Sequence, residues 1–295
     1  MNLLKNWTLP IAMLIGALGY KVMDYLSFIT PYLIFTMLLL TFSKISLRDL
    51  RPRLSHLYLL CIEIVGAIAV YYILVPFDPI VAQGIMICII CPTATAAAVV
   101  TGKLGGNVAS ITTYTLLCNI AVASVIPALF PIIAPSAHHT SFWAAFSHIM
   151  GRIFPLLICP FLLAQLIRGL LPKINAKLTS ISGLAFYMWA IALTIAMGMT
   201  VRSLIEEPTD THTLILLSLG SLIACLFQFF TGKAIGKASN DTIACGQSLG
   251  QKNTILAIWI CSAYLNPVTA LAPGLYVIWQ NFFNSTQLYL ARKKQ

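Results

Sequence analysis

The sequence predicts an all-α polytopic membrane protein with about ten transmembrane helices. Hydrophobic residues make up 59% of the 295 residues and charged residues only 9%, whereas soluble domains carry about 25% charged residues. Apolar runs recur along the whole chain, and two of them, near Pro92 and near Lys252, are interrupted. Interrupted apolar segments at corresponding places in two halves are typical of secondary transporters. We therefore expect two inverted five-helix repeats, residues 1–134 and 141–295, each with one broken helix.

The expected spans follow from the length of the apolar runs, since a helix needs about 20 apolar residues to cross a bilayer. The fourth span breaks at Pro92, because a proline inside a helix removes a hydrogen bond and clashes with the preceding turn. The ninth breaks within residues 246–254, where glycines and polar residues surround Lys252. In chain order the expected spans are residues 7–20, 25–42, 54–74, 79–102, 108–133, 142–170, 181–205, 214–231, 239–265 and 267–290.

The basic residues of the loops predict the orientation in the membrane. If both termini are cytoplasmic, only Lys21 and Arg202 among the loop cations lie outside, together with the acidic loop 206–210. This asymmetry is what the positive-inside rule describes, and it predicts a multi-pass protein of the cell inner membrane. The same dispersal of basic residues argues against a nucleic-acid partner. The cations then placed inside are Lys5, Lys44, Arg48, Arg51, Arg53, Lys103, Arg168, Lys173, Lys177, Lys233, Lys237 and Arg292 to Lys294.

Several function classes find little support in the sequence. All eight cysteines lie in apolar runs, so we expect neither disulfides nor a metal site from the lone Cys88 and Cys91 pair. His138 and His139 lie in a loop, His148 is isolated, and no Ser/His/Asp set or carboxylate pair lies at one depth, so we expect no enzyme. We also expect no cofactor, apart from sodium or a proton as a possible coupling ion, and no obligatory protein partner. A channel would need a continuous polar lining, and a sensor would need a soluble output domain. Both remain as remote alternatives.

Three charged residues are predicted near the middle of the bilayer. Glu63 lies about nine residues into the third span and Arg152 about ten residues into the sixth, at 1.5 Å per residue, and Lys252 lies at the ninth-span break. Such charges mark either a pathway or relay, or a structural salt bridge of Glu63 with Arg152 or Lys252. One carboxylate cannot neutralise both cations, so at least one cation stays available to an anionic ligand unless it faces water or Lys252 is deprotonated. Helix ends near Thr95 and Asn253 would add positive dipole ends, so an anionic substrate is expected.

The residues around the two breaks resemble the bile acid:sodium symporter family, and the resemblance covers essentially the whole chain. Pro92 and Thr95, then Gly106 and Asn107, and finally residues 249–254 carry it. The resemblance implies a panel of spans one, two, six and seven beside a core of spans three to five and eight to ten, in which the broken helices cross. Substrate would bind between panel and core. Relatives carry bile acids, steroid conjugates and other organic anions, including smaller carboxylates.

The sequence departs from this family where the family binds sodium. The ninth-span motif of the family is E-x-G-x-Q-N, and here Ser248 replaces the glutamate and Lys252 the glutamine. Ala97 and Ala98 replace a serine–asparagine pair. Backbone carbonyls and Thr115 alone would make a poor sodium site.

We therefore expect Lys252, paired with Glu63, to do the electrostatic work of one sodium ion. Transport would be sodium-independent, either uniport or proton-coupled; a conventional sodium-coupled symporter of bile acids or related anions is the alternative. The threonine hydroxyls either contact the ligand or bond to helix backbones. The expected substrate-binding or ion-binding residues are Glu63, Thr93, Thr95, Thr115, Arg152, Ser248, Gln251, Lys252 and Asn253.

Overall fold

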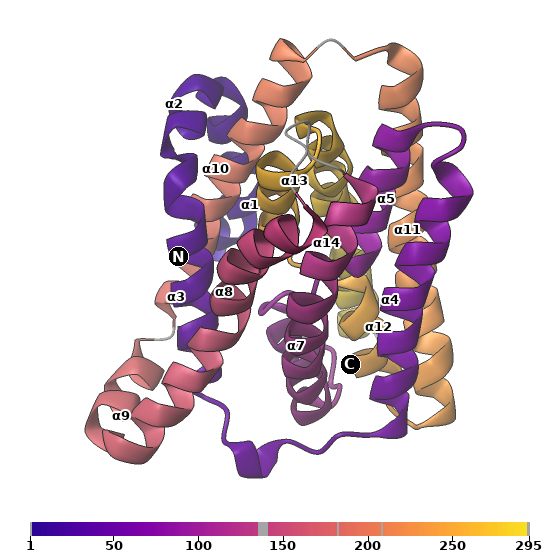
Figure 1. The fold of residues 1–295 in the computed structure, drawn as a ribbon. Helices are drawn as coiled ribbons and strands as arrows, with labels where there is room; N and C mark the ends of the chain where they lie inside the picture. The colour runs from indigo at the N-terminus through magenta and orange to yellow at the C-terminus, as the bar shows by residue number, and fades with distance from the viewer. Residues whose placement is uncertain (1, 135–140, 182, 208, 294–295) are drawn as a thin grey trace.

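The computed structural model describes residues 2–134, 141–181, 183–207 and 209–293, and this part of the chain is helical (Figure 1). The predicted link at 135–140 and residues 294–295 lie outside the described residues. The helices up to residue 134 are α1 (Asn2–Leu18), α2 (Tyr20–Tyr25), α3 (Thr30–Phe42), α4 (Leu54–Leu74), α5 (Pro79–Ile90), α6 (Ala97–Lys103) and α7 (Val108–Ile133). Those that follow are α8 (Phe142–Leu170), α9 (Pro172–Ser180), α10 (Leu184–Glu206), α11 (Thr211–Ala238), α12 (Thr242–Gly250), α13 (Thr254–Tyr264) and α14 (Leu271–Lys293). Short 3₁₀ turns cover Leu26–Ile29, Leu47–Asp49 and Pro267–Ala270.

Six stretches of the described chain are long and apolar enough to cross a membrane. They are Tyr20–Phe42, which runs from α2 to α3, and the helices α4, α7, α8, α10 and α11. The helices α5 and α13 are apolar but shorter, as the halves of broken spans should be. This composition confirms the predicted class, a polytopic α-helical membrane protein.

Side-chain caps explain where several core helices begin. The Asp78 carboxylate accepts hydrogen bonds from the backbone N–H groups of Ile80, at 2.8 Å, and Val81, at 3.1 Å, ahead of α5. The Asn107 side chain does the same for Ser110 at the start of α7, at 3.0 Å. Asx residues satisfy the free N–H groups of a helix N-terminus in this way. The first broken-helix region is thus delimited on both sides by local sequence.

Two predicted boundaries differ from the structure. Residues 172–180 were expected to be a loop but form α9, because Pro172 suits the first turn of a helix and no breaker follows it. The eighth span was expected to end at residue 231, before Lys233, but α11 continues to Ala238. Charges alone do not end a helix, and the Lys233 ammonium lies 5.0 Å from the centroid of the Phe283 ring. The chain turns just after α11, at Asn240, whose φ is 53°.

The helices pack in two groups (Figure 1). In the first group, α1, α2 and α3 pack against α10, and α3 also packs against α8. In the second group, α4, α5, α11, α12 and α14 pack against one another. Helix α13 contacts α3 and α10 of the first group as well as α5 and α14 of the second. The C-terminal half of the second broken helix therefore lies where the two groups meet.

Within the second group, α11 and α12 approach each other closely. A Cβ atom on Gly250 would lie 2.3 Å from Cδ1 of the Phe229 ring, and one on Gly232 would lie 2.4 Å from the Cys245 carbonyl oxygen. No side chain fits at such distances without a shift of the neighbouring helix. Small residues at helix interfaces are the usual device for close packing in membranes. These glycines therefore fix the position of α12, and with it the start of the second break.

Candidate functional site

The two breaks in the apolar helices lie against each other. The Ala94 N–H donates to the Gln251 carbonyl at 2.8 Å, and the Asn253 N–H donates to the Pro92 carbonyl at 2.8 Å. These bonds form an isolated antiparallel bridge between Thr93 and Lys252. Backbone groups that a break leaves free are costly in an apolar interior, so each break satisfies the other. Segments 157 to 161 residues apart in sequence are thereby joined at one point.

A side-chain hydrogen bond reinforces this junction. The Thr93 hydroxyl donates to the Ser248 carbonyl at 2.7 Å, so it bonds across the two broken helices and not to its own helix. The Asn253 side chain accepts from the Leu256 N–H at 3.3 Å and caps α13. Both interactions use residues that the sequence singled out. They explain the local geometry of the breaks without requiring a ligand.

A buried ion pair lies at the same junction. The Lys252 ammonium nitrogen is 2.7 Å from Oε1 of Glu63 on α4, and the two side chains are 1% and 0% exposed. The Tyr114 hydroxyl donates to Oε2 of Glu63, and the Cys118 thiol lies 3.2 Å from both carboxylate oxygens. Of the two partners that the sequence left open for Glu63, the structure selects Lys252.

Polar groups of α11 and α14 hold the second break from the other side. The Gln280 side chain accepts from the Lys252 N–H at 2.9 Å. The Tyr276 hydroxyl donates to the Gly250 carbonyl at 2.9 Å and accepts from Nε2 of Gln228 at the same distance. The sequence reading missed these residues, as it missed Tyr114 and Cys118. A signal was available for α14, because Gln280 and Asn284 are four residues apart and share one helix face.

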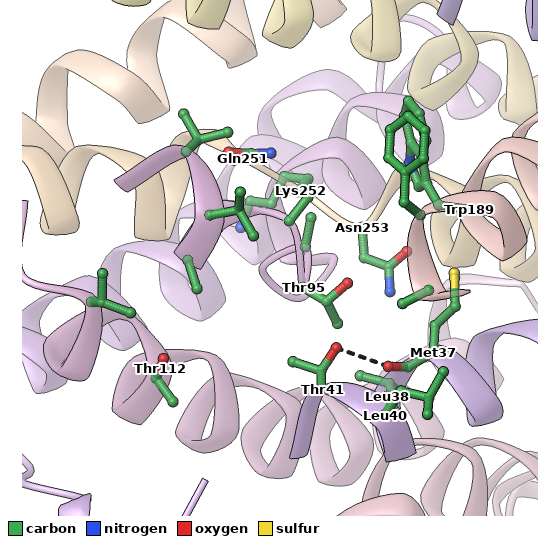
Figure 2. A pocket seen from close by; sticks show the side chains of 18 of the residues that line it. Met37, Leu38, Leu40, Thr41, Thr95, Thr112, Trp189, Gln251, Lys252 and Asn253 are labelled. Atoms are coloured by element: carbon green, nitrogen blue, oxygen red, sulfur yellow. Dashed lines mark hydrogen bonds between the residues drawn. The ribbon is translucent and has the colours of Figure 1, made fainter. Parts of the chain in front are cut away.

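A cavity of about 910 Å³ opens between the two helix groups beside this junction. Figure 2 shows Thr95, Lys252 and Asn253 of the breaks near one another, with Met37 and Trp189 beside them. The apolar lining includes Ile34, Met37, Leu38, Leu40, Phe186 and Trp189. The polar lining includes Thr41, Lys44, Thr95, Lys103, Thr112, Gln251, Lys252, Asn253, Gln280, Asn281, Asn284 and Ser285. Apolar walls with a few convergent polar groups are typical of small-molecule sites.

Five of the nine predicted site residues do not line the cavity. Glu63, Thr93 and Ser248 lie behind the cavity wall, where their hydrogen bonds join helices. Thr115 does not line the cavity, and its hydroxyl donates to the Ile111 carbonyl of its own helix at 2.8 Å.

Arg152 is not brought to the junction. It is exposed on α8, does not line the cavity, and forms no ion pair with a described residue. The alternative pairing of Glu63 with Arg152 is therefore not formed. Depth along a helix can be counted from the sequence, but the face that points inward cannot be assigned when the helix is apolar all round.

Two residues beside the first break offer no side-chain oxygen to a sodium ion. Ala97 is fully buried and Ala98 lines the cavity, and neither carries an oxygen beyond the backbone. Both carboxylate oxygens of Glu63 are already engaged. Among the residues that the structure describes, no group of three or more His, Cys, Asp or Glu side chains could hold a metal. The positive charge at the junction is that of Lys252.

Comparison with known protein families identifies the family of the chain. The sequence model of the sodium bile acid symporter family matches residues 20–207, which is well over half of the chain. The chain belongs to the sodium bile acid symporter family. Members are membrane transporters, in agreement with the apolar helices of the structure. The match includes Glu63 and the first break but ends before the second break and Lys252. No match was found among curated proteins.

Proposed function

We propose that the protein is a secondary transporter that carries organic anions, bile acid-like or smaller carboxylates, by alternating access. It would consist of two inverted five-span repeats, residues 1–134 and 141–295, in the cell inner membrane with both termini cytoplasmic. The panel would comprise α1, α2, α3, α8 and α10, and the core the remaining spans. The two packing groups and the position of one broken helix in each half support this arrangement.

The observation that carries the proposal is the buried contact of 2.7 Å between Lys252 and Glu63. The family has a glutamine at the position of Lys252, and in the family this position would contribute to a sodium site. Here the Lys252 ammonium group lies at the junction and neutralises the buried Glu63 carboxylate. A charge buried in this way is stable only when it is paired. Transport would then need no sodium, because the charge that sodium supplies is part of the chain.

The proposed movement keeps the junction intact. Hydrogen bonds between the two breaks, and from Gln280 and Tyr276 to the second break, make the core one rigid unit. The panel contacts this unit through α8, which packs against α7, and through α3 and α10, which pack against α13, so a substrate in the cavity touches both parts. Rocking of one part against the other around a fixed site is the usual form of alternating access. Uniport and proton coupling are both compatible with a junction of this kind.

Uptake by purified protein in liposomes tests the proposal. Taurocholate is a suitable probe, because its sulfonate group keeps the molecule charged. The charged molecule does not leak through the bilayer. The initial rate is measured with a sodium gradient, with a proton gradient and with neither. We expect saturable uptake that is the same with sodium and with choline. Uptake that requires sodium would support the conventional symporter instead.

A variant sharpens the experiment. Lys252→Gln restores the residue of the family, and we expect it to lose uptake in choline. Lys233→Gln is the matched control, because Lys233 lies on a neighbouring helix and forms no ion pair with a described residue. Equal loss in both variants would argue against a specific role of Lys252.

A further inference from the structure

The charges around the cavity are unevenly distributed. Three lysines line it, Lys44, Lys103 and Lys252, and none of its described lining residues is acidic. Lys252 is 1% exposed and its ammonium contacts Glu63, so this pair contributes no net charge. Lys44 and Lys103 are exposed and form no ion pair with a described residue. The positive charge that a ligand can reach therefore comes from these two residues.

The two lysines approach the cavity from different parts of the fold. Lys44 follows α3, which belongs to the first helix group, and Lys103 is the last residue of α6, beside the first break. The innermost lining residues, such as Lys252 and Gln280, are buried. Lys44 and Lys103 thus mark the solvent-exposed end of the cavity, and Lys252 its closed end.

Topology alone does not account for this placement. Basic residues are enriched in cytoplasmic loops whatever their neighbours. Arg48 is exposed in the same loop as Lys44, yet it does not line the cavity. Lys237, at the end of α11, is also exposed and does not line it. Arg48 and Lys237 contribute to membrane orientation as Lys44 and Lys103 do, but they lie outside the cavity. They therefore serve as controls for a general effect of surface charge.

We infer that Lys44 and Lys103, and not Lys252, hold the anionic group of the substrate at the exposed end of the cavity; this inference rests on the proposed role of the cavity as the transport site. The ligand would be an amphipathic organic anion with its acid group at one end. Its apolar body would lie against Met37, Leu38 and Trp189. Lysine ammonium groups make strong hydrogen bonds to carboxylate and sulfonate oxygens. A ligand held by both lysines would bridge the end of α3 and the end of α6.

A pair of ligands that differ only in charge tests the inference. Cholate and its uncharged methyl ester are titrated into the full-length protein in nanodiscs, with tryptophan fluorescence as the readout, since Trp189 lines the cavity. We expect Lys44→Gln/Lys103→Gln to weaken cholate binding about tenfold or more, because two charge-assisted bonds are lost. Binding of the methyl ester should change less than about twofold. Arg48→Gln/Lys237→Gln should bind both ligands as the wild type does.

Three results would overturn the inference. Unchanged cholate affinity in the double lysine variant would show that neither lysine holds the acid group. Equal weakening of cholate and its ester would show a general effect on the cavity. Equal weakening in the Arg48→Gln/Lys237→Gln control would assign the effect to surface charge. In each case taurocholate uptake by the wild type still reports on the proposed function separately; absence of both binding and uptake in the wild type would refute the two together.

Discussion

Removing Lys252 while leaving Glu63 should destabilise the protein strongly. Lys252→Met keeps most of the side-chain volume but leaves the carboxylate, which is 0% exposed, without its cation. Breaking a buried ion pair from one side typically costs about 3–5 kcal/mol. Because both partners are buried, solvent screening does not reduce this figure. The Tyr114 hydroxyl and Cys118 thiol would still donate to Glu63 but carry no charge.

The double variant Glu63→Gln/Lys252→Met should recover most of this loss. A neutral pair of similar volume has no uncompensated charge, and such replacements are often close to neutral. The matched control is Lys233→Met, which removes a half-buried lysine without an ion pair to a described residue and should cost less than about 1 kcal/mol.

Thermal unfolding of the purified variants in one detergent measures the effect. A change of 1 kcal/mol moves the midpoint by about 2–4 °C for proteins of 150–250 residues. Lys252→Met should therefore lower the apparent midpoint by roughly 10 °C, and the double variant by only a few degrees. A double variant as unstable as the sum of the two single variants would refute the reasoning, since it would show that the two residues act independently.

Three further changes probe the junction. Gly250→Val should abolish accumulation of folded protein, because even a Cβ would lie 2.3 Å from the Phe229 ring; a normal monodisperse gel-filtration peak would contradict this. Thr93→Val should cost about 0.5–1.5 kcal/mol, since it removes the 2.7 Å bond to the Ser248 carbonyl, and an unchanged unfolding midpoint would count against it. Asn253→Ala should cost about 1 kcal/mol by removing the cap of α13, whereas Asn253→Asp should retain stability.

The sequence predicted the main features of the fold for identifiable reasons. Apolar runs of membrane length gave the helices, and Pro92 and the glycines around Lys252 gave the two breaks. Helix boundaries were less predictable where only charges were available, as at Lys233, because a lysine can stay within a helix when its ammonium finds an aromatic partner.

The candidate site was predicted in part. Glu63 and Lys252 were recognisable because charged residues are rare in apolar spans. Arg152 satisfied the same criterion but lies exposed on α8, since sequence depth does not reveal which way a side chain points. Tyr114 was missed because a tyrosine in a membrane helix carries no signal until its partner is known. Gln280 was missed although its spacing of four residues from Asn284 on one face of α14 was a usable signal.

Charge movement during transport tests the central claim most directly. Taurocholate uptake is measured in liposomes with choline in place of sodium, while potassium gradients and valinomycin impose inside-negative, zero or inside-positive potentials. If Lys252 replaces sodium, uptake proceeds at the same rate as in sodium and is not stimulated by an inside-negative potential. Uniport of a monovalent anion would be stimulated by an inside-positive potential, and coupling to one proton would be electroneutral. Uptake that requires sodium and rises at inside-negative potential would contradict the account.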